Sequence, residues 1–233
     1  IFHSPVEVGN YSYIYSLLNF VLVLCTYSVS KALYPYAVES YNNKDGKKSN
    51  FFINSVLKYN IMLTLPALAG FFILRREIVT LLSGTNYLVA VPIVPFLLLF
   101  PLMEGVFISF KYMLLLKKKT KVIGKVYIIG MIMNLVLNFI LIPKYSYYGA
   151  AIATSITYLM MAIMFVIEAK NYFKIDWVYL RLIRIILSTA IMGVAIYFIQ
   201  PQEVFGKIVT ISLGVLVYAF SLFISKSFVK EEI

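Results

Sequence analysis

Two ionisable side chains inside one apolar stretch offer the clearest chemistry in the sequence. Glu104 and Lys111 are seven residues apart. Seven residues make two helical turns, so we expect both on one face, separated by about 10 Å along the axis. A charged group is costly within a membrane, so Glu104 is a candidate ion-coupling carboxylate and Lys111 a candidate cation for an anionic substrate. The alternatives are a structural partner for a neighbouring lysine and a lysine that extends to the membrane edge.

A second set of polar side chains follows one direction of the first apolar stretch. Lys31 lies about 80° to one side of this direction at helical spacing. We interpret Lys31 as a candidate cation for an anionic headgroup, and Asn19, Tyr27 and Tyr34 as candidate substrate contacts. Alternatively, Lys31 reaches the membrane edge and the stripe packs against another helix. The stripe consists of Ser12, Ser16, Asn19, Tyr27, Ser30 and Tyr34.

Helix packing is the interpretation we favour for three further residues. Asn134 and Asn138 are four residues apart and share a helix face, where amides in a bilayer bond across to another helix. Gly149 opens a run of small residues that lets two helix backbones approach closely.

The composition excludes an ordinary soluble domain. Of the 233 residues, 61% are hydrophobic and only 13% are charged, whereas soluble domains have about 25% charged residues. Cys25 is the single cysteine and His3 the single histidine. Cysteine clusters and multi-histidine sites are therefore excluded, and no nucleotide-binding or metalloprotease motif is present. We expect no metal, no cofactor, no enzymatic activity and no nucleic-acid partner.

The apolar stretches are long enough for an all-α, polytopic bundle of about seven transmembrane helices. A transmembrane helix needs about 20 mostly apolar residues. Prolines and charges in the first and third stretches predict tilted or broken helices there. The expected spans are 11–38, 51–74, 87–115, 125–143, 147–168, 185–200 and 207–225.

The basic residues orient these spans. The net charge is +11, and fourteen of the 21 lysines and arginines fall in connections on one side of the bundle, against four on the other. Basic connections stay in the cytoplasm, so we expect the chain to start outside and end inside, with membrane lipids around it. The fourteen are Lys44, Lys47, Lys48, Lys117, Lys118, Lys119, Lys121, Lys125, Lys170, Lys174, Arg181, Arg184, Lys226 and Lys230.

Several short strings, in order, resemble one family, the polysaccharide (O-antigen type) flippases of the multidrug/oligosaccharidyl-lipid/polysaccharide exporter superfamily. The last cluster is the most specific, although Ser146 stands where the family pattern has glycine. The strings are Val8-Gly9-Asn10-Tyr11-Ser12, Leu33-Tyr34-Pro35, Leu81-Leu82-Ser83-Gly84-Thr85-Asn86-Tyr87, Ile142-Pro143 and Gly149-Ala150-Ala151-Ile152-Ala153-Thr154.

The resemblance implies a protein of about twice this length, with two helical lobes around a central cavity. Residues 1–168 would form part of the second lobe with about five helices, and residues 169–233 would add two more. The missing N-terminal half would be a partner. The family implies transport of undecaprenyl-pyrophosphate-linked oligosaccharide across the cytoplasmic membrane, driven by an ion gradient. A drug or lipid exporter, or an integral-membrane glycan polymerase or ligase, is the alternative.

The charge pattern predicts that a reporter fused at Lys230 reads as cytoplasmic, because the basic connections hold that end inside. Paired alkaline phosphatase and green fluorescent protein fusions measure the side. Phosphatase activity at Lys230 would overturn the orientation.

Overall fold

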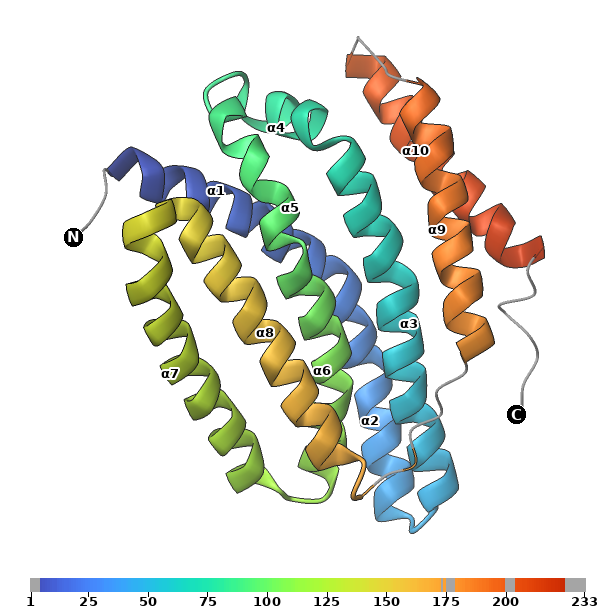
Figure 1. Ribbon diagram of the computed structural model, residues 1–233. Helices are drawn as coiled ribbons and strands as arrows, with labels where there is room; N and C mark the ends of the chain where they lie inside the picture. Colours follow the sequence, from blue (N-terminus) through green and yellow to red (C-terminus); the bar gives the residue numbers. More distant parts are fainter. Residues whose placement is uncertain (1–4, 173, 175–178, 200–203, 225–233) are drawn as a thin grey trace. The chain divides into compact units, whose positions relative to one another are not determined.

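The computed structural model describes residues 5–172, 174, 179–199 and 204–224, and every regular element in these ranges is a helix (Figure 1). Their order explains how the apolar stretches are used. The elements are α1 (Pro5–Leu22), η1 (Val23–Tyr27, a π-helix), α2 (Ser28–Asn42), α3 (Gly46–Ile73), α4 (Arg75–Ser83), η2 (Leu88–Ile93, a 3₁₀-helix), α5 (Val94–Leu97), α6 (Leu99–Leu116), α7 (Thr120–Tyr145), α8 (Tyr147–Ala169), α9 (Tyr179–Ile199) and α10 (Val204–Ile224).

Six helical stretches in the described ranges are long and apolar enough to cross a membrane. The seventh expected span is represented by the shorter apolar stretch Val209–Ile224 of α10. The first stretch runs without a break from Pro5 to Asn42. In the third, Pro92 lies in η2 and Pro95 in α5, ahead of the long α6. Proline lacks a backbone N–H, which explains why regular α-helix starts only after this segment.

The chain divides into two compact units, and the division falls within α3. The first unit contains Ile1–Thr64 and Val89–Asp176, and the second contains Leu65–Leu88 and Trp177–Ile233. The expected boundary near residue 168 lies close to the second crossing point, but the segment 65–88 also groups with the C-terminal helices. In the second unit α9 packs on α10, where Gly214 lies against Ile196.

The first unit is built around α6 and α8, with α7 packed mainly on α8. Phe107, Phe110 and Phe165 are fully buried at its centre, and the rings of Phe107 and Phe165 stack 5.2 Å apart. Burying such rings contributes much of a core's stability in water, whereas inside a bilayer close packing takes over that role. The aromatic core therefore fixes α6 against α8 and so fixes the direction of the side chains on both.

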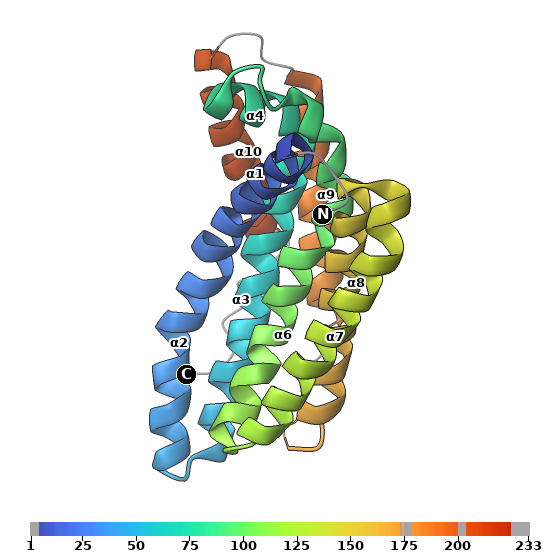
Figure 2. The ribbon, with the colours of Figure 1, turned by 90° about the vertical axis from the view of Figure 1, so that its left-hand side faces the viewer.

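The basic connections of the first unit lie together. In two perpendicular views the α2–α3 connection, the α6–α7 connection and the C-terminal end of α8 are at the same end of this unit (Figure 1, Figure 2). These segments carry Lys44, Lys118 and Lys170, all exposed. The grouping agrees with the sorting of charges from the sequence. Lys226, Lys230 and the start of the chain lie outside the described residues.

A tight turn and a close helix contact join α7 to α8. Ser146, between the helices, has a left-handed backbone with φ of 53°, a conformation that glycine adopts most easily. A Cβ at Gly149 would overlap the Leu141 carbonyl group and come within 2.9 Å of the Ile142 backbone nitrogen. The two backbones can approach this closely only because Gly149 has no side chain.

Gly149→Ala is therefore expected to lower the stability of the full-length protein by about 1–3 kcal/mol, because the added methyl group forces α7 away from α8. Gly124→Ala is the matched control, since nothing lies within 4 Å of the corresponding Cβ position in α7. Thermal unfolding in detergent measures both variants. Equal midpoints for the two would contradict the contact.

Candidate functional site

Glu104 is the only acidic side chain among the described residues that is buried, with 8% of its surface exposed. It projects from the first turns of α6, and the hydroxyl group of Tyr27 donates a hydrogen bond to its carboxylate. Tyr27 ends η1, so this bond joins the first and third membrane stretches. A hydrogen bond to a charged carboxylate is stronger than one between neutral groups, which offsets part of the cost of burial.

The π-helical turn η1 decides which residues of the first stretch reach Glu104. A π-helical turn takes one extra residue, so the side chains after it are rotated by about 100° relative to an uninterrupted α-helix. Ser12, Ser16 and Asn19, before the turn, are exposed, whereas Ser30, after it, is fully buried. The single polar stripe expected from α-helical spacing is therefore wrong, and its two halves face different surroundings.

The candidate substrate residues also separate. Lys31 and Asn19 are exposed on the first unit and do not line its cavity. Lys111 is half-buried, with Nζ 3.5 Å from the hydroxyl oxygen of Tyr127. The ring of Tyr34 stacks on Tyr112 with centroids 4.2 Å apart. The structure thus brings Tyr27 to Glu104, whereas Lys31 and Asn19 lie on another surface.

A buried polar layer, which the sequence did not reveal, holds η1 and α2 against α3 and α6. Thr26 Oγ1 lies 3.1 Å from Thr64 Oγ1, within hydrogen-bond distance. Asn60 Nδ2 donates to Ser30 Oγ at 3.3 Å and to the Gly105 carbonyl oxygen at 3.2 Å. A Cβ at Gly105 would lie 3.2 Å from Thr26 Oγ1, so glycine beside Glu104 leaves room for this layer. The available signal was the i, i+4 pair Asn60 and Thr64 in the second span.

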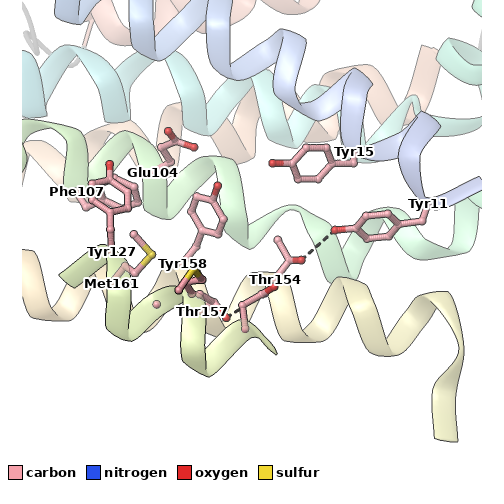
Figure 3. A pocket seen from close by; sticks show the side chains of 12 residues that line it. Tyr11, Tyr15, Glu104, Phe107, Tyr127, Thr154, Thr157, Tyr158 and Met161 are labelled. Atoms are coloured by element: carbon pink, nitrogen blue, oxygen red, sulfur yellow. Dashed lines mark hydrogen bonds between the residues drawn. The ribbon is translucent and has the colours of Figure 1, made fainter. Parts of the chain in front are cut away.

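A cavity of about 390 Å³ opens beside Glu104 within the first unit (Figure 3). The hydroxyl groups of Tyr15 and Tyr158 point toward the region that also holds the Glu104 carboxylate. Tyr11 closes part of one end, with its hydroxyl oxygen 2.9 Å from Thr154 Oγ1. The cavity is lined by Tyr11, Tyr15, Glu104, Phe107, Tyr127, Gly130, Met131, Asn134, Thr154, Thr157, Tyr158 and Met161.

This arrangement gives a carboxylate with a fixed partner on one side and a polar cavity on the other. The cavity is large and polar enough to hold water, since one water molecule occupies about 30 Å³ in the liquid. A proton or a small cation can therefore reach Glu104 without crossing the apolar core. Among the described residues, no group of three or more His, Cys, Asp or Glu side chains is placed to hold a metal ion.

The two asparagines expected in helix packing form a chain between α7 and α8. Asn138 Nδ2 donates to Asn134 Oδ1 at 2.9 Å, and Asn134 Nδ2 donates to Thr157 Oγ1 at 3.3 Å. Thr157 in turn donates to the Ala153 carbonyl oxygen. Asn134 also lines the cavity, so this chain supports one wall of it.

Residues 2–218 match the family described as lipid II flippase MurJ. The chain belongs to this family. The match covers the whole described helical region except the last turns of α10. The family is one of membrane transporters and not of enzymes, which agrees with the expectation from the sequence.

Similar proteins support the same placement. A "probable low-salt glycan biosynthesis flippase" of Haloferax volcanii is 19% identical over 94% of this chain and 47% of its own length. An uncharacterized membrane protein of Methanocaldococcus jannaschii is 28% identical over 60% of this chain and 28% of its own. The chain thus spans about half or less of the curated relatives it matches.

A solved structure confirms the fold class. The structure titled "Lipid II flippase MurJ, inward closed conformation" superposes with a TM-score of 0.80 at 22% identity, over 94% of this chain and 47% of that one. The chain is therefore a multi-pass, all-helical membrane bundle that matches about half of a MurJ structure. Membership of the superfamily inferred from the sequence is confirmed, and the matched branch is MurJ.

Proposed function

We propose that this chain is the C-terminal half of a flippase that moves undecaprenyl-pyrophosphate-linked oligosaccharide across the cytoplasmic membrane for polysaccharide biosynthesis. The observation that carries the proposal is the match of residues 2–218 to a family of lipid-linked precursor flippases. The relative named as a glycan biosynthesis flippase supports an oligosaccharide substrate. The remaining half of the same protein is the required partner, and the C-terminus lies in the cytoplasm.

Lys31 is the residue we assign to the pyrophosphate. It is exposed on the first unit, and Asn19 is exposed earlier on the same long helical stretch. A side chain on such a surface can meet a substrate that moves along the bundle, and an ammonium group binds phosphate as a point charge. Lys111 is a second cation for the same headgroup, at the other side of the π-helical turn from Asn19. Tyr34, stacked on Tyr112, offers a ring face to sugars.

Glu104 is the residue we assign to ion coupling. Its burial, its single short bond to Tyr27 and its access to the cavity support uptake and release of a proton or cation during each cycle. Tyr27 belongs with this carboxylate and not with the sugar, because its hydroxyl proton is already donated.

A lipid-linked peptidoglycan precursor is the second candidate substrate. The description of the matched family favours it. Both substrates present a pyrophosphate between a polyprenyl chain and a glycan, so the same cations serve either one.

Lys31→Ala is expected to lower the amount of surface glycan roughly tenfold at unchanged protein level, since a hydrogen bond to a charged group contributes about 1.5–3 kcal/mol. Quantitative glycan blots of cells that depend on this protein measure the effect. Lys121→Ala, which removes an exposed lysine from the start of α7, is the matched control. Unchanged glycan in Lys31→Ala cells would leave Lys31 as a residue that only reaches the membrane edge.

Glu104→Gln is expected to abolish acceleration of transport by an imposed ion gradient while slow, gradient-independent movement continues, because glutamine cannot exchange a proton or hold a cation by charge. Reconstituted vesicles containing the full-length protein measure both rates. Glu39→Gln, which neutralises an exposed carboxylate of α2, serves as control. Normal acceleration in the Glu104→Gln protein would remove Glu104 as the coupling group.

A further inference from the structure

The π-helical turn and the buried carboxylate meet at one hydrogen bond. Val23–Tyr27 is the only π-helical segment in the described ranges, and its last residue is the one that donates to Glu104. π-helical turns often occur at functional sites, because the extra residue can be absorbed or released at modest cost. We propose that Tyr27 is a positioning residue that transmits the charge of Glu104 to this turn and so sets the rotation of α2. This inference rests on the proposed role of Glu104 in transport.

The turn is held on one side only. Thr26 is fully buried and within hydrogen-bond distance of Thr64 on α3, and Tyr27 is tied to α6 through Glu104. On the opposite side, Val23 and Leu24 are 44% and 55% exposed, respectively, on the described protein. The bonds of two adjacent residues therefore keep the π-helical register, and no packing of Val23 and Leu24 opposes a change.

The strength of the Tyr27 bond depends on the charge of its acceptor. A phenol donates to a carboxylate about twice as strongly as to a neutral carbonyl group. Glu104 faces the cavity on its other side, so a proton or cation that arrives there competes with Tyr27 for the same carboxylate. Neutralising Glu104 thus weakens the bond without altering any other contact of the turn.

The surroundings of Glu104 make its charge the main variable. Lys111, on the same helix, is the cation that acts on it electrostatically. From α3, the side chains in the polar layer are the non-titrating Asn60 and Thr64. The titratable groups that face this region from the packed elements are Tyr15 of α1, Tyr27 of η1, Tyr34 of α2, Tyr112 of α6, Tyr127 of α7 and Tyr158 of α8.

Release of the turn has a defined consequence for the substrate-facing residues. If the π-helical turn becomes α-helical, the residues after it rotate by about 100° relative to those before it. Lys31 follows the turn by four residues and moves with α2. A single hydrogen bond between Tyr27 and Glu104 can therefore couple an ion-binding event to the position of the lysine assigned to pyrophosphate.

Cys25 provides a native reporter of this turn. It is the single cysteine of residues 1–233, it lies within Val23–Tyr27, and it is half-buried. The rate at which N-ethylmaleimide modifies Cys25 reports local opening of the segment. The experiment uses the full-length protein in nanodiscs, with cysteines outside residues 1–233 replaced, at one fixed pH.

Tyr27→Phe and Glu104→Gln are each expected to raise the labelling rate several-fold, and the double variant to be no faster than the faster single variant, because both remove one interaction. Tyr34→Phe is the matched control and should label like the wild type. Glutamine can still accept a neutral hydrogen bond from Tyr27. Wild-type labelling of Glu104→Gln, or multiplied effects in the double variant, would overturn the dependence on charge.

A second measurement covers the case in which Glu104→Gln does not fold. The ratio of the Tyr27→Phe labelling rate to the wild-type rate is expected to fall toward one as the pH is lowered. Ionisation of Cys25 affects both proteins alike and cancels in the ratio, whereas protonation of Glu104 weakens the bond in the wild type only. A ratio independent of pH would contradict the proposal. Neither measurement uses a substrate, so their failure leaves the proposed flippase function standing.

Discussion

The first unit is organised by the need to satisfy one carboxylate inside the membrane. Glu104 can remain there only if polar groups and water compensate its charge, because a bilayer supplies neither. Tyr27 supplies the direct bond, and the cavity supplies access to water. To bring Tyr27 there, the first helical stretch takes on a π-helical turn, and to admit Thr26 beside it, α6 has Gly105 next to the carboxylate. The polar layer around Asn60 then fixes α3 to the same centre.

The two halves of the proposed site face different surroundings. Glu104 and Tyr27 lie inside the first unit, whereas Lys31 is exposed on it. A transporter needs such a separation, because the ion that drives the cycle and the lipid that is moved must bind at distinct places whose states are linked. The chain spans about half of its matched relatives, so the remainder of the protein is available to complete the surface on which Lys31 lies.

The sequence predicted the spans well because continuous apolar stretches of about 20 residues have few other uses. It also found Glu104, since a carboxylate in such a stretch needs a reason. It failed on the polar stripe because regular α-helical spacing was assumed through Tyr27, and no residue pattern signals a π-helical turn. The layer around Asn60 and Thr64 escaped because polar residues of three spans must be placed in space before their contacts can be recognised.

Transbilayer movement by the purified, full-length wild-type protein tests the central claim most directly. Liposomes would carry a fluorescent undecaprenyl-pyrophosphate-linked oligosaccharide, and a membrane-impermeant quencher would report the leaflet that it occupies. The account predicts net transfer across the bilayer that exceeds protein-free liposomes and accelerates when a proton or sodium gradient is imposed. A folded protein that leaves the oligosaccharide lipid in its original leaflet under both gradients would contradict it.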